Sequence, residues 1–239
     1  MTWSIVAHDP ATGAFGVAVA TRAFAVGARC PWLRAGVGAV STQSMSNHYL
    51  GPAILDRLAH GVEPAQAIEA ALAGDAGRGL RQVHCVDRHG RTAAWTGGNC
   101  VEWCGHRTAD GFSVAGNMLA GAPVVEASRE AYARGAGTPF PERLLGALVA
   151  GQAAGGDKRG KQSAALMVTT DDIIPDVNLR VDDHADPIPE LGRLLAIWRR
   201  DVEPRRHWYP SLANPAGLTD LDAMEAEWKR RGLDLRFRR

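Results

Sequence analysis

The chain has 239 residues, which is enough for one large domain with a continuous hydrophobic core. Its formal net charge of +1 gives no electrostatic reason to expect binding to nucleic acid or to an anionic membrane, and its 46% hydrophobic content is that of an ordinary globular protein. The sequence opens without a signal-peptide pattern and contains no apolar run long enough to span a bilayer. We therefore expect a cytoplasmic protein with no nucleic-acid or membrane partner.

The first twenty residues predict a β-hairpin. Residues 3–8 and 14–20 are mainly small or apolar, and they flank a turn segment that contains Pro10 and Gly13. Proline fixes φ and glycine allows a positive φ, so this segment favours a reversal of the chain. The hairpin places residue 2 at the tip of a strand that is expected to lie in the core.

The rest of the chain alternates groups of strands with pairs of helices. Strands are expected over residues 36–43, 80–86, 91–96, 112–115, 163–170 and 177–181. Helices are expected over residues 52–60, 64–73, 123–134, 141–153 and 187–200. Elements that come in pairs disfavour a parallel, doubly wound sheet. They favour an α+β protein, a four-layer αββα sandwich with two stacked, mainly antiparallel sheets and outer helices.

The composition changes after about residue 203. The following segment is rich in proline and aromatic residues and contains a charged amphipathic helix near residues 221–231. We therefore expect an αββα domain over residues 1–203 and a C-terminal extension over residues 204–239. This extension is predicted to pack on the body or on a neighbouring subunit of a homodimer or larger homo-oligomer.

Thr2 is the main candidate for a nucleophile. A threonine hydroxyl reacts only with a base within hydrogen-bond reach. Removal of Met1, which a small second side chain favours, would give Thr2 a free α-amino group with a pKa of about 7.7–8.0, able to accept a proton near neutral pH. Arg22, at the end of the second hairpin strand, is the candidate cation that would lower this pKa. The alternative is that Thr2 is an ordinary strand residue.

Two polar segments follow predicted strands and are candidates for contact with substrate. Asn117 stands in a glycine turn, where its amide could face a developing oxyanion, or could simply shape the turn. Ser41, Thr42, Gln43 and Asn47 cluster after the third strand, where they could orient a substrate or form an ordinary polar loop.

A charged loop bounded by glycines precedes the strand expected at residues 163–170. Asp157, Lys158 and Arg159 lie in this loop, and Gln162 follows it. Arginine suits bidentate contact with a substrate carboxylate, so these residues are candidates for substrate binding. A solvated turn is the alternative reading.

Asp182, Asp183 and His184 form the one cluster that suggests a metal-dependent hydrolase, because carboxylate and imidazole groups suit a hydrolytic metal. Adjacent strand residues point to opposite faces, so the two aspartates do not ligate easily together unless the strand has ended. A salt-bridged strand terminus or subunit contact is the alternative. No metal and no cofactor are expected.

Four runs follow one another in the sequence: Thr2-x-Ser4-Ile5-Val6-Ala7 with Asp9-Pro10, Gly116-Asn117-Met118-Leu119, Gly155-Gly156-Asp157-Lys158-Arg159-Gly160-x-Gln162-Ser163-Ala164, and Arg180-Val181-Asp182-Asp183-His184. Through these runs the chain resembles the domain of unknown function 1028 (DUF1028) family, within the N-terminal-nucleophile (Ntn) hydrolase-like superfamily. The resemblance implies an αββα fold and, by analogy with the superfamily, hydrolysis of an amide-type bond.

Three functions follow as hypotheses. The first is an Ntn-type amidohydrolase that cleaves a small amide or ureido-type C–N bond with Thr2 as nucleophile. In this hypothesis Arg22 lowers the pKa of the α-amino group and Asn117 stabilises the oxyanion. The second is a metal-dependent hydrolase that uses the cluster at residues 182–184. The third is a non-catalytic αββα module for ligand binding or assembly.

Overall fold

The structure is a computed structural model that describes residues 2–232. The described residues form two compact units that divide after Gly192, within helix α5 (Pro187–Asp201). The boundary expected after residue 203 stays a prediction.

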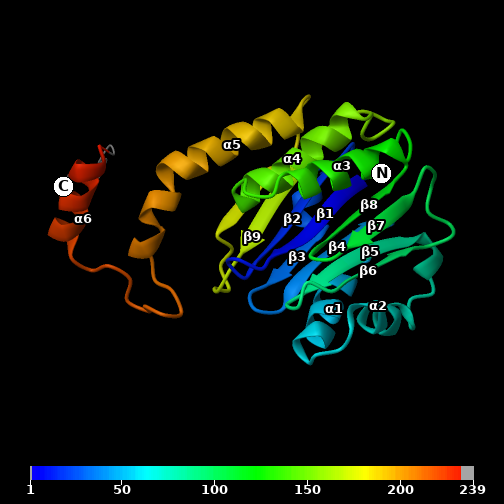
Figure 1. The fold of residues 1–239 in the computed structure, drawn as a ribbon, viewed down its shortest axis with the longest axis horizontal. Coiled ribbons are helices and arrows are strands. Elements are labelled where there is room, and N and C mark those ends of the chain that lie inside the picture. Colours follow the sequence, from blue (N-terminus) through cyan, green and yellow to red (C-terminus); the bar gives the residue numbers. More distant parts are fainter. Residues whose placement is uncertain (1, 233–239) are drawn as a thin grey trace. The chain divides into compact units, whose positions relative to one another are not determined.

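The first unit contains two antiparallel sheets (Figure 1). The larger sheet has the strand order β10-β9-β2-β1-β8-β7 and the smaller has the order β3-β4-β5-β6. The strands of the larger sheet are β1 (Thr2–Asp9), β2 (Ala14–Thr21), β7 (Gly105–Ala109), β8 (Phe112–Asn117), β9 (Ser163–Thr169) and β10 (Val177–Val181). Those of the smaller sheet are β3 (Pro31–Arg34), β4 (Gly38–Ser44), β5 (Arg81–Asp87) and β6 (Thr92–Thr96). The predicted opening hairpin, β1 and β2, lies at the centre of the larger sheet.

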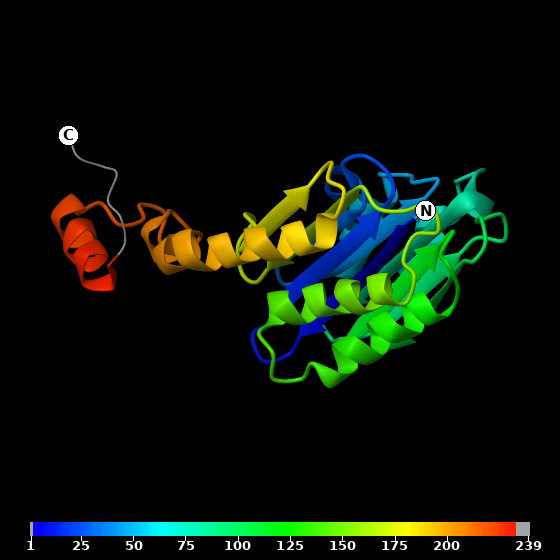
Figure 2. The same ribbon diagram turned by 90° about the horizontal axis from the view of Figure 1, so that it is seen from above.

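Helices cover the outer face of each sheet. Helices α1 (Leu50–Ala59) and α2 (Pro64–Leu72) pack on the smaller sheet, and α3 (Pro123–Arg134) and α4 (Phe140–Ala153) pack on the larger one (Figures 1 and 2). The first unit is therefore a four-layer αββα sandwich, which confirms the predicted α+β fold class. None of the described helices is both long and apolar enough to cross a membrane.

Strand β1 is buried on both of its faces because the larger sheet, to which it belongs, lies between the smaller sheet and helices α3 and α4. Trp3 and Ile5 are both 1% exposed on the face towards α3 and α4, and Val6 packs with Val17 and Val86 in the space between the sheets. This explains why the strand reads as a nearly continuous run of small and apolar residues rather than as a clean alternation.

Gly151 of α4 shows how closely this helix lies on β1. A Cβ at this position would lie 2.6 Å from Trp3 Nε1 and would also meet Ser128 Oγ, whereas a Cβ at Gly146, in the same helix, would meet nothing within 4 Å. Gly151→Ala is expected to destabilise the fold by about 1–3 kcal/mol. Gly146→Ala, the matched control, is expected to stabilise it by about 0.5–1 kcal/mol. Urea unfolding of both variants tests this, and shifts of the same sign would contradict the described packing.

Two edge strands were not expected from the sequence. Strand β3 has four residues and begins at Pro31, and β7 contains exposed polar side chains such as Arg107. Edge strands tolerate proline and polar residues because one side of the backbone faces solvent, so neither shows the usual hydrophobic signal. Helix α1 also begins at Leu50, two residues before the expected start.

The second unit contains the end of α5, the 3-10 helix η3 (Glu203–Trp208) and α6 (Leu221–Arg231). Asp220 caps the N-terminus of α6 by accepting from two backbone N–H groups. The rings of Trp208 and Trp228 lie 4.8 Å apart, and Trp208 Nε1 donates to Glu227. The predicted helix near residues 221–231 is thus present and packs through its tryptophan.

Candidate active site

Thr2 lies in a row of polar residues that crosses the end of the larger sheet. It is directly opposite Asn117 of β8, and its hydroxyl donates to Thr21 Oγ1 of β2 at 3.3 Å. Thr21 in turn is opposite Ser163 of β9. Residues directly opposite one another in antiparallel strands share a face, so these four side chains lie together. The structure thus brings Thr2 and Asn117 together, and their catalytic roles stay predictions.

Asn117 is held by a buried hydrogen-bond network between the two sheets. Gln82 Oε1 accepts from Asn117 Nδ2 and from Gln43 Nε2, both at 2.9 Å. Ser4 Oγ continues the network by donating to Gln43 Oε1 at 2.7 Å. These four residues are at most 1% exposed. The network fixes the amide of Asn117 next to Thr2 and extends from the sheet end into the space between the sheets.

His84 lies deeper in the same network. Its Nε2 is 2.8 Å from Ser4 Oγ and its Nδ1 is 3.1 Å from Ser113 Oγ. The side chain is fully buried, and this burial, with a smaller contribution from His106, lowers the pKa of His84 to about 3. The imidazole is therefore neutral at physiological pH. Its contacts are with Ser4 and Ser113 inside the network between the sheets.

The buried imidazole predicts an acid-dependent loss of stability. Below about pH 6.5 the His84 imidazole is protonated in the unfolded chain, whereas in the folded chain it stays neutral down to about pH 3. Stability should therefore fall with decreasing pH in this window, by up to about 1.4 kcal/mol per pH unit from this residue. Urea unfolding at pH 4, 5 and 7.5 should show a flatter dependence for His84→Gln than for the wild type. The control variant, with the exposed His60 changed to Gln, should follow the wild type; parallel curves for all three proteins would contradict this assignment.

Asp157 ties the charged loop at residues 155–160 to the end of β2. The residue is 3% exposed, and its carboxylate accepts from the backbone N–H of Arg22 at 2.7 Å and from that of Arg159 at 2.8 Å. The backbone of Asp157 also forms an isolated antiparallel β-bridge with that of Leu119, in the turn that follows Asn117. The loop therefore lies at the same end of the sheet as Thr2, and its role in substrate binding stays a prediction.

The side chains of this region have defined partners. Arg22 Nη1 donates to Gln162 Oε1 at 2.7 Å, and Gln162 Nε2 donates to Asp183 Oδ1 at 3.0 Å. Lys158 Nζ donates to the carbonyl of Glu102 at 2.6 Å. Because the Arg22 guanidinium is directed to Gln162, the expected effect of Arg22 on the α-amino group of Thr2 stays a prediction.

The four candidates in and after β4 separate into two pairs. Ser41 Oγ donates to Gln43 Oε1 at 3.4 Å, so both belong to the network between the sheets. Thr42 points to the other face because successive strand residues alternate, and its hydroxyl donates to the carbonyl of Asn47 at 3.2 Å. Asn47 Nδ2 donates to Asp75 at 2.9 Å. Thr42 and Asn47 therefore fix the loop after β4 and are not brought to Thr2.

The acidic cluster that suggested a metal site is engaged in local contacts. Asp182 forms an ion pair with Arg180 at 2.7 Å, Asp183 accepts from Gln162, and His184 Nδ1 accepts from a backbone N–H two residues further on. Within residues 2–232, no group of three His, Cys, Asp or Glu side chains is arranged to hold a metal ion. The described residues thus offer the metal-dependent alternative no ligand set.

Sequence reasoning missed several members of the site. These are Ser4, Thr21, Gln82, His84 and Ser113. One sequence pattern could have indicated them: polar residues at alternate positions of otherwise small or apolar strands, as with Gln82 and His84 in β5. Such a pattern places polar groups on one face of a buried strand, where they need partners from another strand.

Comparisons with known proteins give the family. The model of the family of unknown function DUF1028 matches residues 2–191. The crystal structure of protein SPO2555 from Silicibacter pomeroyi, assigned to DUF1028, is 33% identical with a TM-score of 0.85, and the alignment covers 92% of this chain and 96% of that one. Anbu, an ancestral β-subunit from Yersinia bercovieri, is 11% identical with a TM-score of 0.38 over 89% of this chain and 99% of its own. A comparison with curated proteins gave no match. The chain belongs to the DUF1028 family.

Proposed function

We propose that this protein is an Ntn-type amidohydrolase that cleaves a small amide or ureido-type C–N bond with Thr2 as its nucleophile. The observation that carries the proposal is the polar row at the sheet end. Thr2 Oγ1 lies between Thr21 and Asn117, on a strand that is buried on both faces and is therefore rigidly held. A fixed nucleophile with a side-chain amide beside it is the arrangement that acyl transfer requires.

The reaction would proceed through an ester of Thr2. After removal of Met1, the neutral α-amino group of Thr2 takes the proton from Oγ1 as this oxygen attacks the substrate carbonyl. Asn117 Nδ2 uses one hydrogen for Gln82 and has a second for the oxyanion. The α-ammonium group returns the proton to the leaving nitrogen as the C–N bond breaks. Water then attacks the ester, the α-amino group accepts its proton, and Oγ1 leaves as the hydroxyl.

The charged loop would favour a substrate that carries a carboxylate or a similar acceptor. In the free protein its cations have protein partners, the carbonyl of Glu102 for Lys158 and the carboxylate of Asp157 for Arg159. A substrate carboxylate would take the place of these partners. Arg159 and Lys158 lie in the loop that Asp157 binds to the sheet end, and Arg22 lies at the end of the strand next to Thr2. Arginine and lysine bind carboxylates through charge-assisted hydrogen bonds. The αββα fold and membership of DUF1028, together with the sequence resemblance, support the placement in the Ntn superfamily.

Intact mass and acyl trapping test the proposal together. The untagged protein is expected to lack Met1 and to gain one acyl group when it is treated with a small β-lactone, an electrophile that the nucleophile opens without a leaving group. Peptide mapping should place the group on Thr2, and Thr2→Ala should take up none. Retention of Met1 in the protein, or an acyl group on another residue, would contradict the mechanism and favour a non-catalytic binding module.

A further inference from the structure

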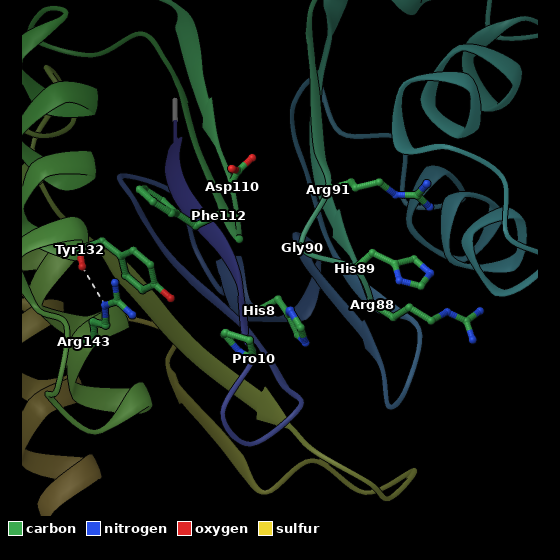
Figure 3. Close-up of a pocket in the computed structure, with 11 residues that line it drawn as sticks. His8, Pro10, Arg88, His89, Gly90, Arg91, Asp110, Phe112, Tyr132 and Arg143 are labelled. Carbon is green, nitrogen blue, oxygen red and sulfur yellow. Dashed lines mark hydrogen bonds between the residues drawn. The ribbon is translucent and has the colours of Figure 1, made fainter.

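A cleft of about 720 Å³ lies at the other end of the first unit (Figure 3). His8 of β1, Phe112 of β8, Tyr132 of α3 and Arg143 of α4 line it, together with the β5–β6 turn at residues 88–91. His8 is six residues along β1 from Thr2, which corresponds to about 20 Å. The volume of the cleft is within the range of small-molecule sites, about 300–1,000 Å³. Because of the distance along β1, a small ligand bound in the cleft does not reach Thr2 Oγ1.

Tyr132 gives this cleft an unsatisfied buried hydroxyl. The side chain is 2% exposed, and its Oη has no hydrogen-bond partner among residues 2–232. Buried hydroxyl groups usually have a partner, because leaving one without a partner costs about 1–3 kcal/mol. Burial also raises the pKa of Tyr132 to about 12, so the hydroxyl keeps its proton and remains a donor. Figure 3 shows the ring directed towards the side of the cleft that holds His8 and Pro10.

Arg143 supplies a cation next to this hydroxyl. Its Nε donates to the Tyr132 carbonyl at 2.7 Å, and its guanidinium carbon lies 3.9 Å from the centre of the Tyr132 ring. These two contacts fix the plane of the guanidinium. Its terminal nitrogens donate to no residue in the described part of the chain and form no ion pair there. The side chain is thus a preorganised fork for an acceptor that comes from outside the protein.

The other cations of the cleft are already engaged. Arg91 pairs with Asp87 at 2.6 Å and with Glu63, and Arg88 donates to the carbonyl of Ala59 at 3.1 Å. In Figure 3 both side chains are directed away from Tyr132. The lining also includes a carboxylate, Asp110. Of the arginines that line the cleft, Arg143, next to Tyr132, is therefore the one that remains for an anionic ligand.

Aromatic rings also line the cleft. The Phe112 and Tyr132 rings lie 4.6 Å apart, and the His8 ring stacks on Phe15 at 4.8 Å with its nitrogens bonded to no residue among those described. Such a wall suits a flat, apolar group, while the donors suit a carboxylate. We propose that this cleft is a second ligand site, which binds an aromatic carboxylate through Arg143 and Tyr132.

Binding of sodium benzoate, measured by isothermal titration calorimetry with benzamide as the neutral analogue, tests the proposal. Benzoate should bind the wild type at least about tenfold more tightly than benzamide, because charged hydrogen bonds are the stronger ones. Arg143→Gln should remove this preference. The matched control Arg134→Gln, which changes an exposed arginine of α3 that is paired with Glu130, should keep it.

Tyr132→Phe separates a binding role from a structural one. Removing a hydroxyl without a partner should leave the melting temperature of the free protein unchanged or raised, yet weaken benzoate binding about three- to tenfold. The proposal is overturned if the wild type does not prefer benzoate, if Arg143→Gln binds it as Arg134→Gln does, or if Tyr132→Phe binds it with unchanged affinity.

Discussion

Replacing Thr2 with alanine is expected to lower kcat for amide hydrolysis by at least about a thousandfold, with the fold intact. Alanine is also a small second residue, so Met1 removal and the free α-amino group are retained, and only the hydroxyl is lost. That hydroxyl donates to Thr21 Oγ1 at 3.3 Å, which is long for a bond between hydroxyl groups, so loss of this contact should cost little stability. Single-turnover kinetics on a small amide, with melting temperature measured in parallel, gives both quantities.

Thr2→Ser is the control for this prediction. Serine keeps the hydroxyl and the adjacent amine, so it should retain most of the activity that alanine loses. Equal rates for the alanine variant and the wild type would show that Thr2 is not the nucleophile. Equal loss in both variants, with the fold retained, would show that the hydroxyl alone does not account for the role of Thr2.

Replacing Gln82 with leucine is expected to destabilise the fold by about 2–4 kcal/mol. Gln82 is fully buried, accepts from Asn117 and Gln43, and donates to Thr96 Oγ1 at 2.9 Å and to the carbonyl of Gly116 at 2.8 Å. Leucine has a similar size but leaves these polar groups without their partner. The loss in free energy of unfolding comes from the buried polar groups that no longer have a hydrogen-bond partner. It is therefore larger than the contribution of a single hydrogen bond.

The matched control is Gln66→Leu, at an exposed position of α2. It makes the same chemical change at the surface and should alter the free energy of unfolding by less than about 0.5 kcal/mol. Urea unfolding of the two variants gives the comparison. A Gln82→Leu protein as stable as the control would show that the network between the sheets contributes little. In a folded Gln82→Leu protein, release of the Asn117 amide should also lower kcat.

Much of the scaffold was predictable because it depends on local signals. Pro10 and Gly13 mark the hairpin turn, and the pairing of strands with strands and helices with helices indicates the layered sandwich. The edge strands β3 and β7 were not predictable, because an edge strand with one side towards solvent needs no apolar alternation. Thr42 shows a similar limit. Its place in a polar cluster suggested a role in substrate binding. In β4, however, side chains alternate between the two faces, so Thr42 lies on the opposite face from Ser41 and Gln43.

The sequence by itself indicated that Thr2 begins a buried strand, that Asn117 comes shortly after another strand, and that a charged loop precedes the strand at residue 163. Only the tertiary structure decided that Asn117 is opposite Thr2 and that Gln82, from the other sheet, holds its amide. It also decided that Tyr132 and Arg143 meet at a cleft far from Thr2. The physical reason is the same in each case. Strand periodicity fixes the face on which a side chain lies, but the neighbour across that face depends on strand order and layer packing, which are set by contacts between distant parts of the chain.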